Sequence, residues 1–200
     1  MSPSNRQKVL KIAQKKGVIC AKDLAKQGIH RQSLKRLEEQ SLLIRSGRGI
    51  YTYPKADITE NHSLVEATQR VPKGTICLLS ALSFHKITTQ NPWEIWLAIP
   101  QKSRHPQEKL LPLRIVYMSG SSLIEGVENH QIEGCKVPIY SLPKTVVDCF
   151  KFRHKIGLDV ALEALRECWQ QQRCSMDELW HYAKVCRMRN VMRPYLESLT

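Results

Sequence analysis

The sequence has no long apolar run, because no stretch of 18 residues is free of charged side chains. A helix that spans a bilayer needs about 20 predominantly apolar residues, so the sequence predicts no membrane-spanning segment. The N-terminal stretch MSPSNRQKVLKIAQKKG also lacks the apolar core of a secretory signal peptide. These absences predict a cytoplasmic protein that does not bind a membrane.

The seven cysteines follow no recognisable pattern, since they are scattered and no two are spaced as C-x-x-C. An odd, scattered set argues against a disulfide framework. Cys168, Cys174, His181 and Cys186 lie near one another in the sequence, but their spacing does not match a usual zinc site. We interpret these cysteines as small buried apolar residues and expect no metal ion.

The short motifs that identify common catalytic sites are also missing. The sequence contains no Gly-rich phosphate loop, no H-E-x-x-H pair and no G-x-S-x-G turn. Carboxylates do not cluster as they do in nucleases, because Glu94 is followed by hydrophobic residues rather than by a Glu-x-Lys element. We therefore expect no catalytic residues, no cofactor and no enzymatic activity.

The basic charge is concentrated at the N-terminus. Residues 1–55 contain 13 Lys or Arg and 3 Asp or Glu, a net charge of +10 out of +13 for the whole chain. A small basic head on a nearly balanced body is typical of a module that binds a polyanion. The alternative is a solvated, lysine-rich surface without a ligand.

Three helices are predicted in this head, over residues 5–16, 21–27 and 30–40. In the first, Val9, Ile12 and Ala13 share one face, and Gly17 is a suitable C-terminal stop. Cys20 and His30 precede the second and third helices, where Ser or Thr would be the favoured N-cap. We therefore expect weaker starts for these two helices.

The third helix has the pattern of a recognition helix. Leu34 and Leu37 are three residues apart and share the buried face. At 100° per residue the polar side chains fall on the opposite face or its flanks, where they could reach base edges in the major groove of DNA. The residues predicted to do so are Arg31, Gln32, Ser33, Lys35 and Arg36.

A basic hairpin is predicted directly after this helix. Residues 42–45 and 50–53 have the composition of two short strands, and Ser-Gly-Arg-Gly at 46–49 forms the turn. Such a hairpin is a wing, and Arg45 and Arg48 would contact phosphate or the minor groove. Three helices followed by this hairpin predict a winged helix-turn-helix that binds double-stranded DNA.

The sequence resembles the AbiEi-type antitoxins of type IV toxin–antitoxin systems. The head carries the resemblance in GVICAKDLAKQGIHRQSLKRLEEQSLLIRSGRGIYTYP. Three stretches of the body resemble the C-terminal domain of the same family, namely LLSALSFHKITTQNPWEIWLAIP, VPIYSLPKTVVDCFKFRHKIGLDVALEAL and MDELWHYAKVCRMRNVMRPYLE. The head motif is common to many regulators, whereas the body segments are more specific.

The resemblance implies two activities. The head would bind inverted repeats at the promoter and repress its own operon. The body would counter a nucleotidyltransferase-like toxin by acting on the target or effect of that toxin rather than through a tight complex. The rival hypotheses are a stand-alone regulator whose body senses a ligand or dimerises, and a nuclease-like enzyme that the head targets to DNA.

The body is predicted to mix strands and helices. Strands are expected over 93–99, 113–118, 129–132 and 136–140. Helices are expected over 62–70, 75–86, 143–153, 158–172, 175–186 and 188–199. The fold class is therefore α+β, with the winged helix-turn-helix at residues 1–55 and a mixed α/β C-terminal domain at residues 60–200 that ends in a helical bundle.

A second basic patch is predicted in the body, at Lys144, Lys151, Arg153 and Lys155. It could contact nucleic acid or offset nearby acidic residues, and the sequence does not separate the two. We interpret Asp148 and Lys151 as a pair on the helix surface. Ser141 and Lys144 have the S-x-x-K spacing, which we interpret as a helix cap followed by a solvated lysine.

Overall fold

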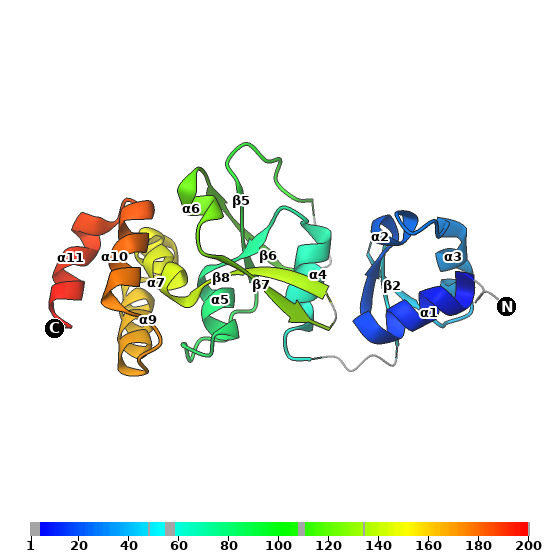
Figure 1. Ribbon diagram of the computed structural model, residues 1–200, viewed down its shortest axis with the longest axis horizontal. Coiled ribbons are helices and arrows are strands. Elements are labelled where there is room, and N and C mark those ends of the chain that lie inside the picture. Colours follow the sequence, from blue (N-terminus) through cyan, green and yellow to red (C-terminus); the bar gives the residue numbers. More distant parts are fainter. Residues whose placement is uncertain (1–4, 48, 55–58, 108–110, 134, 200) are drawn as a thin grey trace. The chain divides into compact units, whose positions relative to one another are not determined.

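The computed structural model describes residues 5–47, 49–54, 59–107, 111–133 and 135–199 (Figure 1). Helices and strands are both present in number, so the chain is a mixed α+β protein, as predicted. No helix in these described ranges is both long and apolar enough to cross a membrane.

The chain divides into two compact units. The N-terminal unit comprises residues 1–72 and 130–137, and the C-terminal unit comprises residues 73–129 and 138–200. The N-terminal unit thus includes the head, a helix that follows residue 60, and the end of a later hairpin at residues 130–137. The predicted division into domains at 1–55 and 60–200 stays a prediction about which segments fold independently.

The three helices of the head are α1 (Asn5–Lys16), α2 (Ala21–Ala25) and α3 (Arg31–Glu39). Gly17 follows α1 with a φ of +66°, a left-handed conformation that glycine adopts without steric cost. Cys20 and His30 are the N-cap residues of α2 and α3, and neither side chain makes a capping hydrogen bond. The expected absence of strong caps is confirmed.

The head also contains an antiparallel sheet of three strands in the order β1-β3-β2. These strands are β1 (Val18–Cys20), β2 (Ile44–Gly47) and β3 (Ile50–Thr52). The hairpin of β2 and β3 was predicted, whereas β1 was missed, because three residues between two helices are too few to show an alternating pattern. Arg48, which was predicted for the turn of this hairpin, lies outside the described residues.

Helices and sheet of the head enclose one apolar core, and α3 contacts both α1 and α2. The buried residues of this core are Val9, Ala13, Ile19, Leu24, Ile29, Leu34, Leu37, Leu43 and Tyr51.

Two further elements complete the N-terminal unit. Helix α4 (His62–Arg70) packs on β1, and Arg70 donates a hydrogen bond from Nη2 to the Ser46 carbonyl of β2. The thiol of Cys135 donates to the Val18 carbonyl over 3.5 Å. These contacts tie segments that are distant in the sequence to the sheet of the head.

The second sheet has five strands in the order β6-β5-β4-β8-β7. Strands β5 and β6 are parallel, as are β4 and β8, whereas β4 and β5 are antiparallel. The strands are β4 (Thr75–Ile76), β5 (Ile95–Pro100), β6 (Leu113–Met118), β7 (Val127–Ile132) and β8 (Cys135–Tyr140).

The prediction of a helix over 75–86 is wrong at its start. Thr75 and Ile76 form β4, because their backbone pairs with β5 on one side and Ile76 pairs with Ile139 of β8 on the other. Helix α5 (Leu78–Phe84) begins after them. The apolar spacing within the segment is compatible with a helix, so the strand arises from tertiary pairing that overrides the local pattern.

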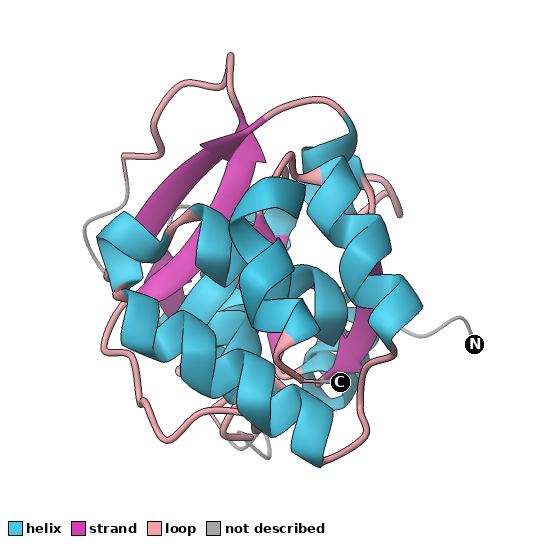
Figure 2. Ribbon diagram, turned by 90° about the vertical axis from the view of Figure 1, so that its left-hand side faces the viewer, coloured by secondary structure: helices cyan, strands magenta, loops and turns pink. Residues whose placement is uncertain are grey.

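Seven helices of the C-terminal unit lie within the described residues, and in Figure 2 helices lie in front of the strands. Helix α7 contacts α5, α9, α10 and α11. The helices are α5, α6 (Ser121–Ile124), α7 (Leu142–Lys151), α8 (Arg153–Ile156), α9 (Leu158–Gln170), α10 (Met176–Val185) and α11 (Arg189–Glu197).

Helix α7 is the centre of this core, because every residue from 142 to 150 is buried. A helix that is buried on all sides has no solvated face for its polar residues. Lys144, Thr145 and Asp148 are therefore buried polar groups that need partners within the protein.

The cysteines are mostly buried, as interpreted from the sequence, but one pair differs. Cys168 of α9 and Cys174, which precedes α10, form a disulfide with Cα atoms 5.9 Å apart, which the scattered pattern did not predict. Cys77, Cys135, Cys149 and Cys186 are buried free thiols, and Cys20 is half-buried. Among the described residues no group of three or more His, Cys, Asp or Glu side chains could hold a metal ion.

Candidate nucleic-acid interface

Helix α3 is held with one face in the core and one in solvent. Leu34 and Leu37 are 0% and 1% exposed, and they anchor the helix against α1 and α2. Because these leucines are on one side of the helix, the side chains between them point outward. The apolar spacing of the sequence thus fixes the orientation of α3.

The predicted contact residues of α3 are mostly exposed. Arg31, Gln32, Lys35 and Arg36 are exposed, and Ser33 is half-buried. Arg45 is exposed on β2, where it pairs across the sheet with Tyr51 of β3.

A hollow of about 690 Å³ lies between α3 and the hairpin of β2 and β3. It brings together four of the predicted residues, from α3 and from β2, but it does not include Ser33 or Arg36. The lining residues are Arg31, Gln32, Lys35, Glu38, Glu39, Arg45 and Tyr51.

Two acidic residues reduce the positive charge of this hollow. Glu38 and Glu39 line it together with Arg31, Lys35 and Arg45. An ion pair joins Lys35 Nζ to Glu39 Oε1 over 3.8 Å, but both side chains are more than half exposed, so the pair adds little stability. The sequence predicted the basic residues but gave no role to these carboxylates, which a helical projection of residues 31–39 would have placed beside Lys35.

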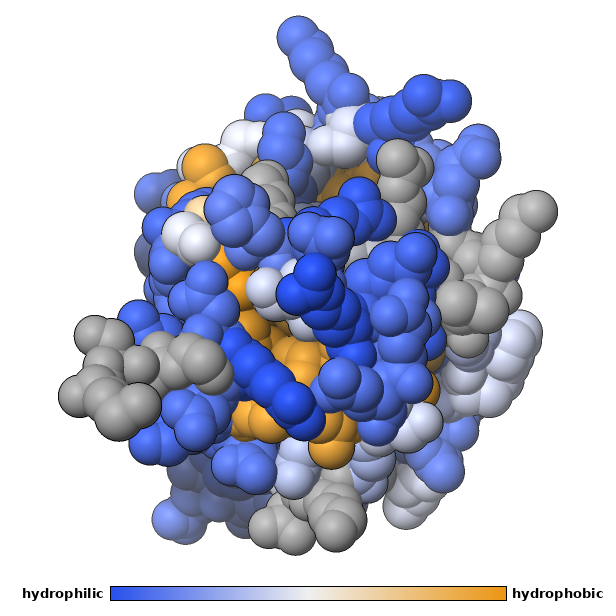
Figure 3. All heavy atoms as spheres, turned by 90° about the vertical axis from the view of Figure 1, so that its right-hand side faces the viewer, coloured by the Kyte–Doolittle hydropathy of each residue, from blue (hydrophilic) through white to orange (hydrophobic). Residues whose placement is uncertain are grey.

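The face that carries α1 and α3 in Figure 1 is turned toward the viewer in Figure 3. Hydrophilic side chains cover most of this face, and apolar surface is visible between them. Ile44, next to Arg45 on β2, is 56% exposed. The surface therefore offers apolar contact as well as hydrogen-bond donors.

The prediction of a second basic patch is wrong for Lys144. Its side chain is fully buried, and Nζ lies 2.5 Å from Asp148 Oδ2. Lys151 is half-buried and donates to Ser122 Oγ over 3.3 Å, and Arg153 donates to the Phe150 carbonyl over 2.9 Å. Only Lys155 among the four predicted residues is exposed.

The same burial corrects two interpretations of α7. Asp148 pairs with Lys144 inside the core and not with Lys151 on a helix surface. Ser141 is the N-cap residue of α7, but its hydroxyl makes no capping hydrogen bond and is buried without a partner among the described residues. Lys144 is not solvated, because α7 is enclosed by its neighbouring helices.

The head defines a class of protein module: a small α+β unit that presents a basic helix to solvent. Residues 7–54 match the family model described as "Transcriptional regulator, AbiEi antitoxin". The resemblance inferred from the head motif is thus confirmed for these residues, which extend from α1 to just beyond β3. The matched segment includes no part of the C-terminal unit.

No curated protein matches the sequence. Among solved structures, the RV2827C protein from Mycobacterium tuberculosis is similar, with 13% sequence identity and a TM-score of 0.56. The similarity covers 98% of this chain and 77% of that chain. At this identity the likeness establishes a common fold and no more.

Proposed function

We propose that the protein is a transcription regulator that binds double-stranded DNA through a winged helix-turn-helix in its head. The observation that carries the proposal is the match of residues 7–54 to an AbiEi regulator family. The exposed basic face of α3 and the antiparallel hairpin beside it support the same interpretation.

In this proposal α3 enters the major groove and the hairpin contacts the DNA backbone. Arg31, Gln32 and Lys35 line one hollow with Arg45, so a base edge and an adjacent phosphate could be contacted together. Ser33 and Arg36 extend the contact along the helix, and Arg48 acts from the turn of the hairpin. Glu38 and Glu39, which line the same hollow, disfavour phosphate beside them and thereby help to fix the register of DNA.

The natural site of binding is proposed to be an inverted repeat in the promoter of its own operon, which the protein represses. The C-terminal unit is proposed to act as the antitoxin that counters a nucleotidyltransferase-like toxin without a stable complex. This part rests on the resemblance of the body segments. We also propose that the protein acts in the cytoplasm, without a cofactor and without catalysing a reaction.

DNA binding is tested by fluorescence anisotropy with two labelled duplexes, the promoter of the operon and a scrambled duplex of equal length. We expect tighter binding to the promoter, and we expect the Arg31→Ala/Arg36→Ala double variant to lose that preference. Arg104→Ala/Arg166→Ala is the charge-matched control, because both arginines are exposed in the C-terminal unit. Equal affinity of the wild-type protein for both duplexes would contradict sequence-specific regulation.

The antitoxin function is tested by expressing the toxin gene of the same operon with and without this protein. Protection of the cells, together with separate elution of the two purified proteins, is expected. A stand-alone regulator, the alternative function, would bind the promoter in the first experiment and give no protection in the second.

A further inference from the structure

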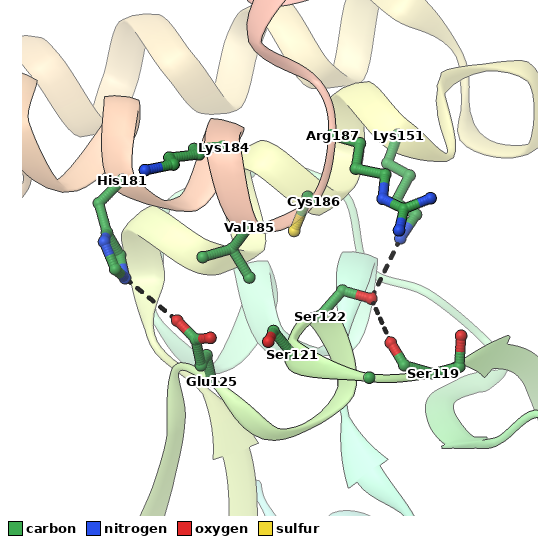
Figure 4. A pocket seen from close by; sticks show the side chains of 11 residues that line it. Ser119, Ser121, Ser122, Glu125, Lys151, His181, Lys184, Val185, Cys186 and Arg187 are labelled. Carbon is green, nitrogen blue, oxygen red and sulfur yellow. Dashed lines mark hydrogen bonds and ion pairs between the residues drawn. The ribbon is translucent and has the colours of Figure 1, made fainter.

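A polar pocket of about 750 Å³ lies in the C-terminal unit, and none of its lining residues belongs to the proposed DNA site (Figure 4). One wall is the serine turn, residues 119–122, which leads into α6. The opposite wall is the end of α10 with the residues that follow it, and Lys151 of α7 closes one end. A volume in this range suits a small molecule.

Three cationic side chains line this pocket: Lys151 and Arg187 lie beside each other at one end, and Lys184 lies at the other end with His181 (Figure 4). Within the described part of the chain no carboxylate forms an ion pair with any of them. Like charges that share a pocket repel one another, so the arrangement is unfavourable unless an anion is bound.

The carboxylate within the pocket does not neutralise Lys151 or Arg187. Glu125 is engaged by His181, with Oε2 3.2 Å from Nε2, and Figure 4 places this pair at the opposite end from Lys151 and Arg187. Burial, followed by the charge of Asp148, raises the pKa of Cys186 to about 12. The Cys186 thiol is therefore neutral and adds no negative charge to the pocket.

Hydrogen bonds within the serine turn fix its polar groups in place. Ser122 donates from Oγ to the Ser119 carbonyl over 2.9 Å and accepts from Lys151 Nζ over 3.3 Å. These bonds hold the ammonium group of Lys151 beside the turn. Figure 4 shows Arg187 pointing toward the same turn, and the exposed hydroxyl of Ser121 is an additional donor.

Arg187 is held in place by the backbone on both sides. Its φ is +59°, a left-handed conformation that is uncommon for residues other than glycine. Its neighbours Cys186 and Met188 are buried, and the Met188 amide donates to the Ala183 carbonyl over 2.7 Å. The fixed backbone thus starts the Arg187 side chain at the pocket, and the side chain itself is exposed.

We propose that this pocket binds a small phosphate-bearing anion. Arginine matches a phosphate group with a planar pair of donors, lysine adds a point charge, and serine hydroxyls complete the hydrogen bonds. The pocket is larger than one phosphate, so a pyrophosphate or a phosphorylated small molecule fits it. The phosphate could also come from a DNA backbone, and the experiment separates the two sources.

Isothermal titration calorimetry of the full chain with sodium pyrophosphate, at constant ionic strength, tests the proposal. We expect saturable binding, at least ten times weaker in Arg187→Asn and in Lys151→Met. Asparagine tolerates a left-handed backbone, and methionine keeps the apolar stem of the lysine. Arg166→Asn is the matched control, since Arg166 is an exposed arginine outside the pocket, and circular dichroism verifies the fold of each variant.

The same variants are titrated with duplex DNA. Weaker pyrophosphate binding with unchanged DNA affinity supports a small-molecule site. Absence of pyrophosphate binding, with a DNA affinity that falls and a salt slope that flattens by about 0.9 per contact, supports the same phosphate chemistry with DNA as its source. If neither ligand distinguishes the folded pocket variants from Arg166→Asn, the proposal is wrong. Variants of the head, such as Arg31→Ala/Arg36→Ala, should change the affinity for DNA and leave pyrophosphate binding unchanged. A failure of the proposed DNA site is therefore distinguished from a failure of the pocket.

Discussion

Lys144 and Asp148 form a buried ion pair in the C-terminal unit. Both side chains are fully buried, and Lys144 Nζ also lies 4.2 Å from the centroid of the Tyr140 ring. The second carboxylate oxygen of Asp148 accepts from Cys186 Sγ over 3.3 Å. Burial raises the pKa of Asp148, and the ammonium group of Lys144 counteracts part of that shift. Removing either residue would therefore leave the other as a buried charge without its partner.

Gly126 packs directly against the side chain of the buried Lys144. Its φ is +77°, and a Cβ atom there would lie 2.8 Å from Cβ and Cγ of Lys144. Any larger residue would push against the stem of the buried lysine. The close approach explains why the chain uses glycine at this position.

Replacing Lys144 by methionine should destabilise the protein by about 3–5 kcal/mol, because Asp148 is left as a buried carboxylate without its cation. Urea unfolding followed by circular dichroism measures the change. The Lys144→Met/Asp148→Leu double variant should recover most of this loss, since it removes both charges. A single variant as stable as the wild type would contradict the buried pair.

Arg31 and Arg36 should differ in their effect on DNA binding. Arg31 lines the hollow beside Arg45, whereas Arg36 lies outside it. If Arg31 reads a base, Arg31→Ala should cost roughly 1–3 kcal/mol on the promoter and much less on scrambled DNA. Arg36→Ala should weaken both by a similar factor if it contacts phosphate alone. Anisotropy titrations measure the affinity of each variant for both duplexes. If Arg31→Ala loses the same affinity for promoter and scrambled DNA, Arg31 does not recognise a base.

At the scale of elements, the end of the β7–β8 hairpin is tied to the segment around α4 by one carboxylate. Glu133 Oε1 accepts from the Thr59 amide over 2.8 Å and from the Thr59 hydroxyl over 2.9 Å. Its other oxygen lies 2.7 Å from His62 Nδ1. Burial alone would raise the pKa of Glu133, but the hydrogen bonds from His62 and Thr59 outweigh it and lower the pKa below 4.5.

This lowered pKa predicts an acid-sensitive contribution to stability. Because the folded pKa lies below the usual 4.5, the contribution is complete above pH 4.5 and is lost as the pH falls through the folded value. Glu133→Gln should flatten the dependence of the unfolding free energy on pH below 4.5. Urea titrations between about pH 3 and 7 measure this, with Asp177→Asn in the first turn of α10 as the exposed control. An unchanged slope for Glu133→Gln would show that the cluster does not stabilise the folded state.

At the scale of the whole molecule, the charge and the candidate sites are distributed between two units. The first 55 residues carry +10 of the +13 net charge and all the proposed DNA contacts. The C-terminal unit contains the larger apolar core and the polar pocket. Two activities on two units should be separable by mutation.

We predict that the Arg31→Ala/Arg36→Ala variant loses promoter binding and still protects cells from the toxin when both genes are expressed from foreign promoters. Promoter binding is measured by anisotropy and protection by colony counts. The C-terminal unit is unchanged in this variant, which is the physical reason for the expected protection. A folded variant that fails to protect would mean that DNA binding is part of neutralisation.

Local patterns in the sequence determined much of the fold. The spacing of Leu34 and Leu37 fixed the solvent face of α3, and the predicted helices over 5–16 and 62–70 coincide with α1 and α4. The strand over 113–118 also coincides with β6. These elements were predictable because apolar periodicity and helix-end residues act over a few residues of chain.

Only the tertiary structure decided which polar residues meet. A lysine on a helix is solvated in most proteins, and nothing near Lys144 in the sequence indicates that α7 is enclosed on all sides. The strands β1 and β4 are too short for a periodic signal and exist because neighbouring strands pair with them. The polar pocket likewise joins the serine turn to residues of α7 and α10 that are up to about 65 positions away in the sequence. Long-range packing sets these features, and packing depends on the whole chain rather than on any local window.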